Sequence, residues 1–220
     1  MRLLLVRHGQ IPSNVRGVLD TAVPGPALTA LGEEQARALP DALGGHPIGG
    51  LWVSSALRAQ QTAAPLARHL GIEPVQRDGI REISAGNLEM SGRRPDIDVY
   101  VETVVAWAGG DLERRMPGGE TGHEFFHRYD SVVAEAVSLS DDEGSEAVVL
   151  VSHGAAIRCW AGSRADNLNL ENTAHLWLDN TGVVVLEQTG RGWTCLTWAG
   201  DPITGIGAAA PAGPTGEPQR

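Results

Sequence analysis

Short apolar runs alternate along this chain with longer segments in which apolar residues recur at helical spacing. Runs of four to eight apolar residues that end in turns predict buried strands, and a period of 3.6 residues predicts helices. The predicted strands are residues 2–6, 51–53, 75–77, 147–151, 174–179, 182–188 and 192–198. The predicted helices are residues 30–43, 57–70, 96–108, 120–139 and 155–163.

Turn residues mark the boundaries of these segments. Thr29 is typical of a helix N-cap, and Gly44 and Gly71 are typical of residues that end a helix. Residues 10–27 are rich in proline and glycine and are predicted to form a loop, and residues 180–182 (Asn-Thr-Gly) are predicted to form a hairpin turn. Strands that alternate with helices predict a three-layer α/β/α sandwich with a mostly parallel central sheet.

The length of 220 residues is typical of one domain with a sizeable core. We expect that domain to span residues 1–200. Residues 201–220 consist mainly of glycine, alanine and proline, cannot bury much surface, and are predicted to form a disordered tail.

The formal net charge is −10 at pH 7, and all 17 basic residues are arginine. Nonspecific binding to nucleic acid or to an anionic membrane needs a basic field, so both partners are excluded. Cys159 and Cys195 lie in apolar segments and are expected to be reduced core residues. With no signal-peptide pattern and no run long enough to span a membrane, the sequence predicts a cytoplasmic protein.

Two peptides of the same pattern end two of the predicted strands: Val6-Arg7-His8-Gly9 and Val151-Ser152-His153-Gly154. In open α/β sheets, ligands bind beyond the carboxyl ends of the strands, where strands distant in sequence can be neighbours. Two imidazoles and an arginine in one crevice suit an anionic phosphoryl group, with one imidazole free to attack phosphorus.

The two peptides belong to a series of blocks that occur in a fixed order. These are residues 5–10 (LVRHGQ), 28–32 (LTALG), 55–59 (SALRA), Glu82 with Gly86 and Glu89, residues 118–121 (GGET), and residues 151–154 (VSHG) with Ile157 and Arg158. Together they resemble the histidine phosphatase superfamily, in the branch that includes phosphoglycerate mutase-like phosphatases, over residues 3–190. Gln10 stands where many members have Glu, and Thr121 replaces a Ser.

The resemblance implies a role for each matching residue. His8 would attack phosphorus and form a phosphohistidine, and Glu82 would be the general acid and base. Arg7, Arg58 and His153 would surround the phosphoryl oxygens and match the charge of the transition state. Further donors would be Asn14, Gln10 and the backbone near Gly154. The positive charges beside His8 should hold its pKa down, and no cofactor or metal is implied.

Some assignments stay open in the sequence. Glu89 is a second carboxylate that could replace Glu82 as acid and base, and Asn14 could instead cap a turn. Arg114 and Arg115 are either solvated charges or an anion site at the mouth of the pocket. Residues 93–94, both arginine, are expected at the surface.

Residues 123–127 (HEFFH) match the H-E-x-x-H signature of zinc proteases. The helical pattern argues against such a site. The apolar stripe of this segment is Phe125, Tyr129, Val132, Ala136 and Leu139. Because His123 and His127 lie on the opposite side of the helix, we expect them to face solvent, away from any core that could hold a catalytic ion.

The sequence therefore predicts a phosphoric monoester hydrolase of the histidine acid phosphatase type, acting on a small phosphorylated metabolite. One alternative is a phosphoglycerate mutase, although the segment between Glu82 and Gly118 is short for that group and the chain has no lysine. Another alternative is a non-catalytic member that binds phosphorylated ligands. The substrate cannot be read from the sequence, and a homodimer is left open.

Overall fold

The computed structural model describes residues 1–142, 144–168, 176–190 and 192–203. The strands are β1 (Arg2–Arg7), β2 (Ile48–Ser54), β3 (Val75–Arg77), β4 (Ala147–Ser152), β5 (Val183–Thr189), β6 (Gly192–Trp198) and β7 (Asp201–Pro202). The α-helices are α1 (Pro12–Arg16), α2 (Ala30–Leu43), α3 (Leu57–Leu70), α4 (Arg94–Ala108), α5 (Gly122–Asp142) and α6 (Gly154–Arg164). Two short 3₁₀ helices, η1 (Asp78–Ile80) and η2 (Gly86–Leu88), lie between β3 and α4.

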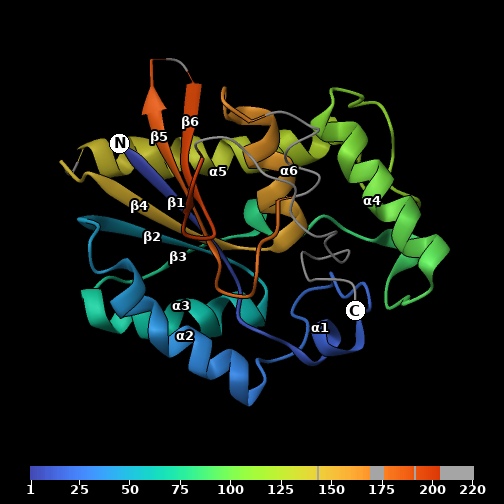
Figure 1. Ribbon diagram of the computed structural model, residues 1–220, viewed down its shortest axis with the longest axis horizontal. Coiled ribbons are helices and arrows are strands. Elements are labelled where there is room, and N and C mark those ends of the chain that lie inside the picture. Colours follow the sequence, from blue (N-terminus) through green and yellow to red (C-terminus); the bar gives the residue numbers. More distant parts are fainter. Residues whose placement is uncertain (143, 169–175, 191, 204–220) are drawn as a thin grey trace.

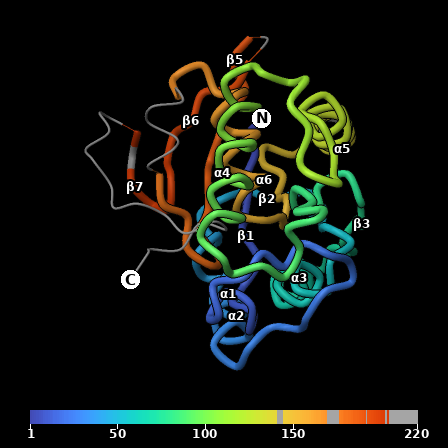
Figure 2. Tube along the Cα trace, turned by 90° about the vertical axis from the view of Figure 1, so that its right-hand side faces the viewer, coloured from blue at the N-terminus to red at the C-terminus, as the bar shows by residue number. Residues whose placement is uncertain are grey.

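Within the described residues, the strands form a seven-stranded sheet in the order β3-β2-β4-β1-β5-β6-β7. Strands β3, β2, β4 and β1 are parallel to one another, and β5, β6 and β7 extend the sheet in antiparallel pairings. Figure 2 shows β3 and β7 on opposite sides of the molecule. Strand β4, late in the sequence, therefore lies between two strands from the first quarter of the chain.

Helices cover both faces of the sheet (Figure 1). Leu3 and Leu5 of β1 point to the face covered by α4, α5 and α6, and Leu4 and Val6 point to the face covered by α2 and α3. All four side chains are fully buried, as expected for a strand with helices on both sides. The structure confirms the predicted α/β/α sandwich.

The local capping signals act where the sequence places them. Thr29 caps α2, because its side chain accepts a hydrogen bond from the backbone of Gly32 at 3.0 Å. Gly71 ends α3 with a φ of 69°, in the left-handed region that glycine tolerates best. The boundaries predicted for these two helices agree with the structure.

The prediction that residues 10–27 form only a loop is wrong, because α1 lies within them. Pro12 occupies the first helical turn, where a missing N–H costs nothing. The side chain of Asn14 accepts a hydrogen bond from the backbone of Ile11, and Gly17 ends the helix. Proline is common in loops, but it also suits the first turn of a helix, and Pro12 has that position here.

The strand predicted at residues 174–179 is absent from its described part, residues 176–179. Residues 174–175 lie outside the described residues. Leu176 and Leu178 are buried, so their alternation reflects packing against the core and not a strand. The turn at Asn180 is present, but it leads into β5 from an irregular segment, so the predicted hairpin there is wrong. The hairpin joins β5 to β6 instead.

Three further expectations have outcomes in the structure. Leu139, predicted to end the apolar stripe of α5, is 47% exposed, because it lies at the edge of the buried face of the helix, which continues to Ser140. The predicted tail contributes β7 at its start, while residues 204–220 lie outside the described residues. Cys159 and Cys195 are free and buried, as predicted. Among the described residues, no helix is long and apolar enough to cross a membrane.

The first turn of α2 packs directly on the backbone that follows β1. A Cβ on Gly32 would lie 2.2 Å from the carbonyl oxygen of Gln10. We expect Gly32→Ala to lower the free energy of unfolding by about 1–3 kcal/mol, because backbone must shift to make room. Urea unfolding measures the change.

The matched control is Gly45→Ala, since no atom lies within 4 Å of a Cβ built on Gly45. Its free energy of unfolding should stay within about 0.5 kcal/mol of the parent value. Equal losses from both variants would contradict the packing argument.

Candidate active site

The parallel strands bring the two histidine peptides together at one edge of the sheet. Arg7 at the end of β1 pairs with Ser152 at the end of β4. The next residues are His8 and His153, whose ring centroids are 5.1 Å apart at an interplanar angle of 62°. Both rings are buried, with His8 3% exposed and His153 fully enclosed.

One ring nitrogen of His8 is left without a proton. Nδ1 lies 2.8 Å from the carbonyl oxygen of Gly9, and because a carbonyl only accepts, Nδ1 must donate. In the neutral ring Nε2 then has a free lone pair. Burial lowers the pKa of His8 well below its usual 6.5, and the charges of Arg58 and Arg7 lower it further.

Two buried guanidinium groups flank this ring. Arg7 follows the apolar core of β1, and its Nη1 donates to the carbonyl oxygen of Leu178 at 2.8 Å. Arg58 is in the first turn of α3, and its Nη1 donates to the carbonyl oxygen of Ala22 at 3.5 Å. Gly25 permits this approach, because a Cβ there would lie 2.4 Å from Nη1 of Arg58.

His153 is oriented by partners on both ring nitrogens. Nε of Arg58 donates to Nδ1 at 3.3 Å, so the proton of the neutral ring is on Nε2. Nε2 then donates to Oγ of Ser54, at the end of β2, over 2.8 Å. Burial, followed by the charge of Arg58, lowers the pKa of His153 well below 6.5.

Two hydroxyl groups that the sequence analysis gave no role hold the site together. Ser54 orients His153, as described above. Thr62 accepts from the backbone of Gly9 at 2.9 Å and donates to the carbonyl oxygen of Arg58 at 2.7 Å, so it joins the His8 turn to α3. A serine at the very end of a buried strand, next to the arginine block, was the available signal for Ser54.

Glu82 is a buried carboxyl group that caps α6, the helix that starts directly after His153. Its Oε1 accepts from the backbone of Ile83 at 2.9 Å and of Ala156 at 2.8 Å, and its Oε2 accepts from Ala155 at 3.2 Å. Burial raises the pKa of Glu82, against the opposing effect of these bonds and of Arg58. Oε2, with one long bond, is the oxygen with room for a proton.

Glu89, the other carboxylate, has a different environment. It accepts from the backbone of Thr21 at 2.7 Å and of Ala22 at 3.1 Å, and from the Thr21 hydroxyl at 2.5 Å. These bonds anchor the segment whose carbonyl oxygen binds Arg58. Glu89 therefore anchors this loop, whereas Glu82 lies at the start of the helix that follows His153.

The other residues that were expected to donate hydrogen bonds to a phosphoryl group lie around the site and contact other parts of the protein. Oδ1 of Asn14 also accepts from Nδ2 of Asn180 at 3.2 Å, and this amide donates to the carbonyl oxygen of His8 at 3.0 Å. The capping interpretation of Asn14 fits these contacts. Gln10 accepts from the Thr29 hydroxyl at 2.9 Å, and Gly154 begins the helix turn that holds Glu82.

The four surface arginines weighed in the sequence analysis all face carboxylates. Their ion pairs are Arg93–Asp96 at 3.9 Å, Arg94–Asp98 at 2.7 Å, Arg114–Glu102 at 3.5 Å and Arg115–Glu124 at 3.2 Å. Their side chains are 38–78% exposed. These contacts favour solvated charge pairs over a second anion site.

The two histidines and the glutamate of the H-E-x-x-H segment lie on the exposed side of α5, and the two residues between them are buried. His123 and His127 are both exposed, as predicted, and Nε2 of His123 lies 3.2 Å from a carboxylate oxygen of Glu113. In the described part of the chain, no three His, Cys, Asp or Glu side chains form a group that could hold a metal ion.

This geometry agrees with the comparison to known proteins. The model of the histidine phosphatase superfamily (branch 1) matches residues 3–201. The chain belongs to this superfamily. The chain is 35% identical over 90% of its length to the PE-PGRS family protein PE_PGRS11 of Mycobacterium tuberculosis, and it spans 36% of that longer relative.

In two other similar proteins, the matched region covers a larger share of the relative's own chain. The probable phosphoglycerate mutase GpmB of Enterobacter sp. is 31% identical over 72% of each chain. The solved mycobacterial glucosyl-3-phosphoglycerate phosphatase superposes with a TM-score of 0.74 at 27% identity, over 90% of this chain and 98% of that one.

The buried, neutral histidines make the stability of this protein depend on pH. The folded state holds the pKa of both histidines well below 6.5. As the pH falls through 6.5, these two side chains therefore take up protons in the unfolded chain and stay neutral in the folded protein. The free energy of unfolding should therefore drop below about pH 6.5. In His8→Asn, the drop between pH 7.0 and pH 5.5 should be smaller by about 1 kcal/mol.

Urea unfolding at the two pH values measures this difference. The pKa of Glu82 is raised, so its contribution has the opposite sign, and parent and variant share it. The exposed His69 supplies the control variant, His69→Asn, which should behave as the parent does. An unchanged pH dependence in His8→Asn would contradict the assignment of a neutral buried ring.

Proposed function

We propose that this protein is a phosphatase that hydrolyses a small phosphomonoester through a phosphohistidine on His8. The observation that supports it most directly is the free lone pair at Nε2 of His8, beside two buried guanidinium groups. A nucleophile without a proton and fixed cations are what phosphoryl transfer needs. The proposal calls for no metal, because the arginines neutralise the phosphoryl charge.

In the first step, Nε2 of His8 attacks phosphorus and forms a P–N bond while the P–O bond to the substrate alcohol breaks. The proton on Oε2 of Glu82 passes to the leaving oxygen. Nδ1 keeps its proton and its bond to Gly9, so the phosphorylated ring stays in place. The raised pKa of Glu82 favours the protonated form that this step needs.

In the second step, a water molecule attacks phosphorus, and Glu82 accepts a proton from it. The P–N bond breaks, its electron pair returns to Nε2, and inorganic phosphate leaves. Arg7 and Arg58 face the same phosphoryl oxygens in both steps, so one arrangement of charge serves both transition states.

Hydrolysis is favoured over the mutase reaction by two features of this chain. The segment between Glu82 and Gly118 is short, and it leaves little chain to shield a phosphohistidine from water. Arg114 and Arg115, the cations that could bind a second anionic group of a phosphoglycerate, are paired with carboxylates. A phosphomonoester with an uncharged leaving group fits this charge distribution.

The variant His8→Asn tests the nucleophile. It should lower kcat for p-nitrophenyl phosphate on the order of 10³-fold or more, because no covalent route remains. Rapid quenching of the parent with radiolabelled substrate should trap a phosphoryl group that is stable in base and labile in acid. His69→Asn is the control. Full activity in His8→Asn, or a parent that never becomes labelled, would refute the proposal.

A panel of phosphomonoesters tests the reaction type. With 3-phosphoglycerate, we expect either no reaction or release of inorganic phosphate, and faster release from esters of uncharged alcohols. Formation of 2-phosphoglycerate would establish the mutase alternative. Tight binding of phosphate without turnover of any ester would establish the non-catalytic one.

A further inference from the structure

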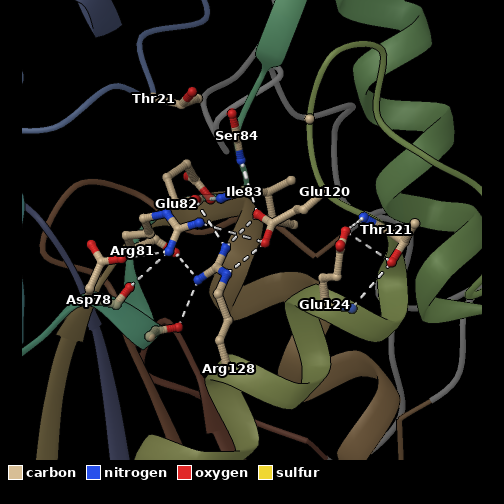
Figure 3. Close-up of polar contacts among 12 residues, drawn as sticks. Thr21, Asp78, Arg81, Glu82, Ile83, Ser84, Glu120, Thr121, Glu124 and Arg128 are labelled. Atoms are coloured by element: carbon tan, nitrogen blue, oxygen red, sulfur yellow. Dashed lines mark hydrogen bonds and ion pairs between the residues drawn. The ribbon is translucent and has the colours of Figure 1, made fainter.

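A largely buried ion pair that has no role in the site described so far lies next to the Glu82 segment (Figure 3). Nε of Arg128, on α5, donates to Oε2 of Glu120 at 2.7 Å, and Nη2 donates to Oε1 at 2.7 Å. The two side chains are only 12% and 9% exposed. A two-pronged pair of this kind fixes the plane of the guanidinium group.

The remaining hydrogen bonds of this pair all go to the backbone around Glu82. Nη1 of Arg128 donates to the carbonyl oxygens of Gly79 at 2.7 Å and of Arg81 at 2.9 Å, and Nη2 donates to that of Glu82 itself at 3.2 Å. Oε1 of Glu120 accepts from the backbone of Ser84 at 3.2 Å. The pair thus holds the chain on both sides of residue 82.

The side chain and the backbone of Glu82 are held by different elements. Its carboxyl group is bound by backbone amides at the start of α6 and by the neighbouring Ile83, and its carbonyl oxygen is bound by α5 through Arg128. The start of α6 lies next to His153. A shift of the backbone at residue 82 would therefore move the carboxyl group of Glu82 away from the start of α6 and from His153. Placement of the acid therefore depends on both anchors.

We propose that Arg128, oriented by Glu120, is the positioning residue that holds Glu82 where it can transfer a proton to the leaving oxygen. This inference rests on the proposed function and extends it to residues that touch no reacting atom. It also assigns a role to Glu120 of the Gly-Gly-Glu block, because Glu120 orients the guanidinium group of Arg128, which in turn holds the backbone of Glu82.

The dependence on the leaving group separates this role from a general structural one. An alkoxide needs a proton as it departs, whereas p-nitrophenolate leaves readily without one. The ratio kcat/KM reports the steps up to phosphorylation of His8. Loss of the acid should therefore lower kcat/KM strongly for an alkyl phosphate and weakly for p-nitrophenyl phosphate.

The experiment compares the parent with Arg128→Lys and Glu82→Gln on the best alkyl phosphate of the panel and on p-nitrophenyl phosphate. We expect Arg128→Lys to lower kcat/KM about 10- to 100-fold for the alkyl phosphate and less than about 3-fold for p-nitrophenyl phosphate. Glu82→Gln should show the same selectivity with a larger effect. Glu120→Gln keeps the shape of the Glu120 side chain and should show the same selectivity with a smaller effect. This variant tests the inference at temperatures at which Arg128→Lys is unfolded.

The matched control is Arg77→Lys. Arg77, on β3, forms a similar two-pronged pair with Glu135, which is on α5, the helix that also carries Arg128. The two distances are 2.8 and 2.5 Å, and Arg77 binds no part of the Glu82 segment. Its loss should change kcat/KM equally for both substrates.

Equal losses for both substrates in Arg128→Lys and Glu120→Gln would overturn the inference while leaving the proposed function intact. Equal losses in Glu82→Gln would instead show that Glu82 is not the acid, and the proposed mechanism would fail together with the inference.

Discussion

The site depends on burying two permanent positive charges beside two imidazoles that must stay neutral. Arg7 and Arg58 are enclosed at the edge of the sheet, and both histidines are enclosed with them. Desolvation and the guanidinium charges act in the same direction on the rings, so neither ring takes up a proton easily. The two guanidinium groups give this part of the protein an excess of positive charge, which a bound dianion would offset.

Much of the surrounding chain compensates for these buried cations. The irregular segment before β5 supplies a carbonyl oxygen to Arg7, and the loop after α1 supplies one to Arg58. Glu82, Asp20 and Glu89 lie near enough to Arg58 to offset part of the cost of its burial. The loops that border the site therefore contribute to the solvation of these charges.

The sequence predicts those parts of the structure that local chemistry decides. Strands β1 and β4 follow from apolar runs, and α2 and α3 follow from their caps, because a strand with both faces buried and a capped helix each leave a short-range pattern. Segments that follow from tertiary contacts were missed or misassigned. Residues 176–179 alternate like a strand, but Leu178 supplies the carbonyl oxygen that accepts a hydrogen bond from Arg7, and Leu139 lies at the edge of the buried face of α5, where its side chain is half exposed. Ser54 and Arg128 bind partners distant in sequence. The position of Ser54 at the end of a buried strand was a local signal for its role, whereas nothing next to Arg128 indicated its role.

The position of β4 between β1 and β2 also bears on how the molecule is made. A ribosome produces β1, β2 and β3 long before β4, and β1 and β2 do not pair with each other, because β4 lies between them. The parallel half of the sheet cannot close until residues 147–152 have been synthesised. During synthesis β1 and β2 therefore keep exposed edges, a state that favours slow folding and exposes the nascent chain to aggregation.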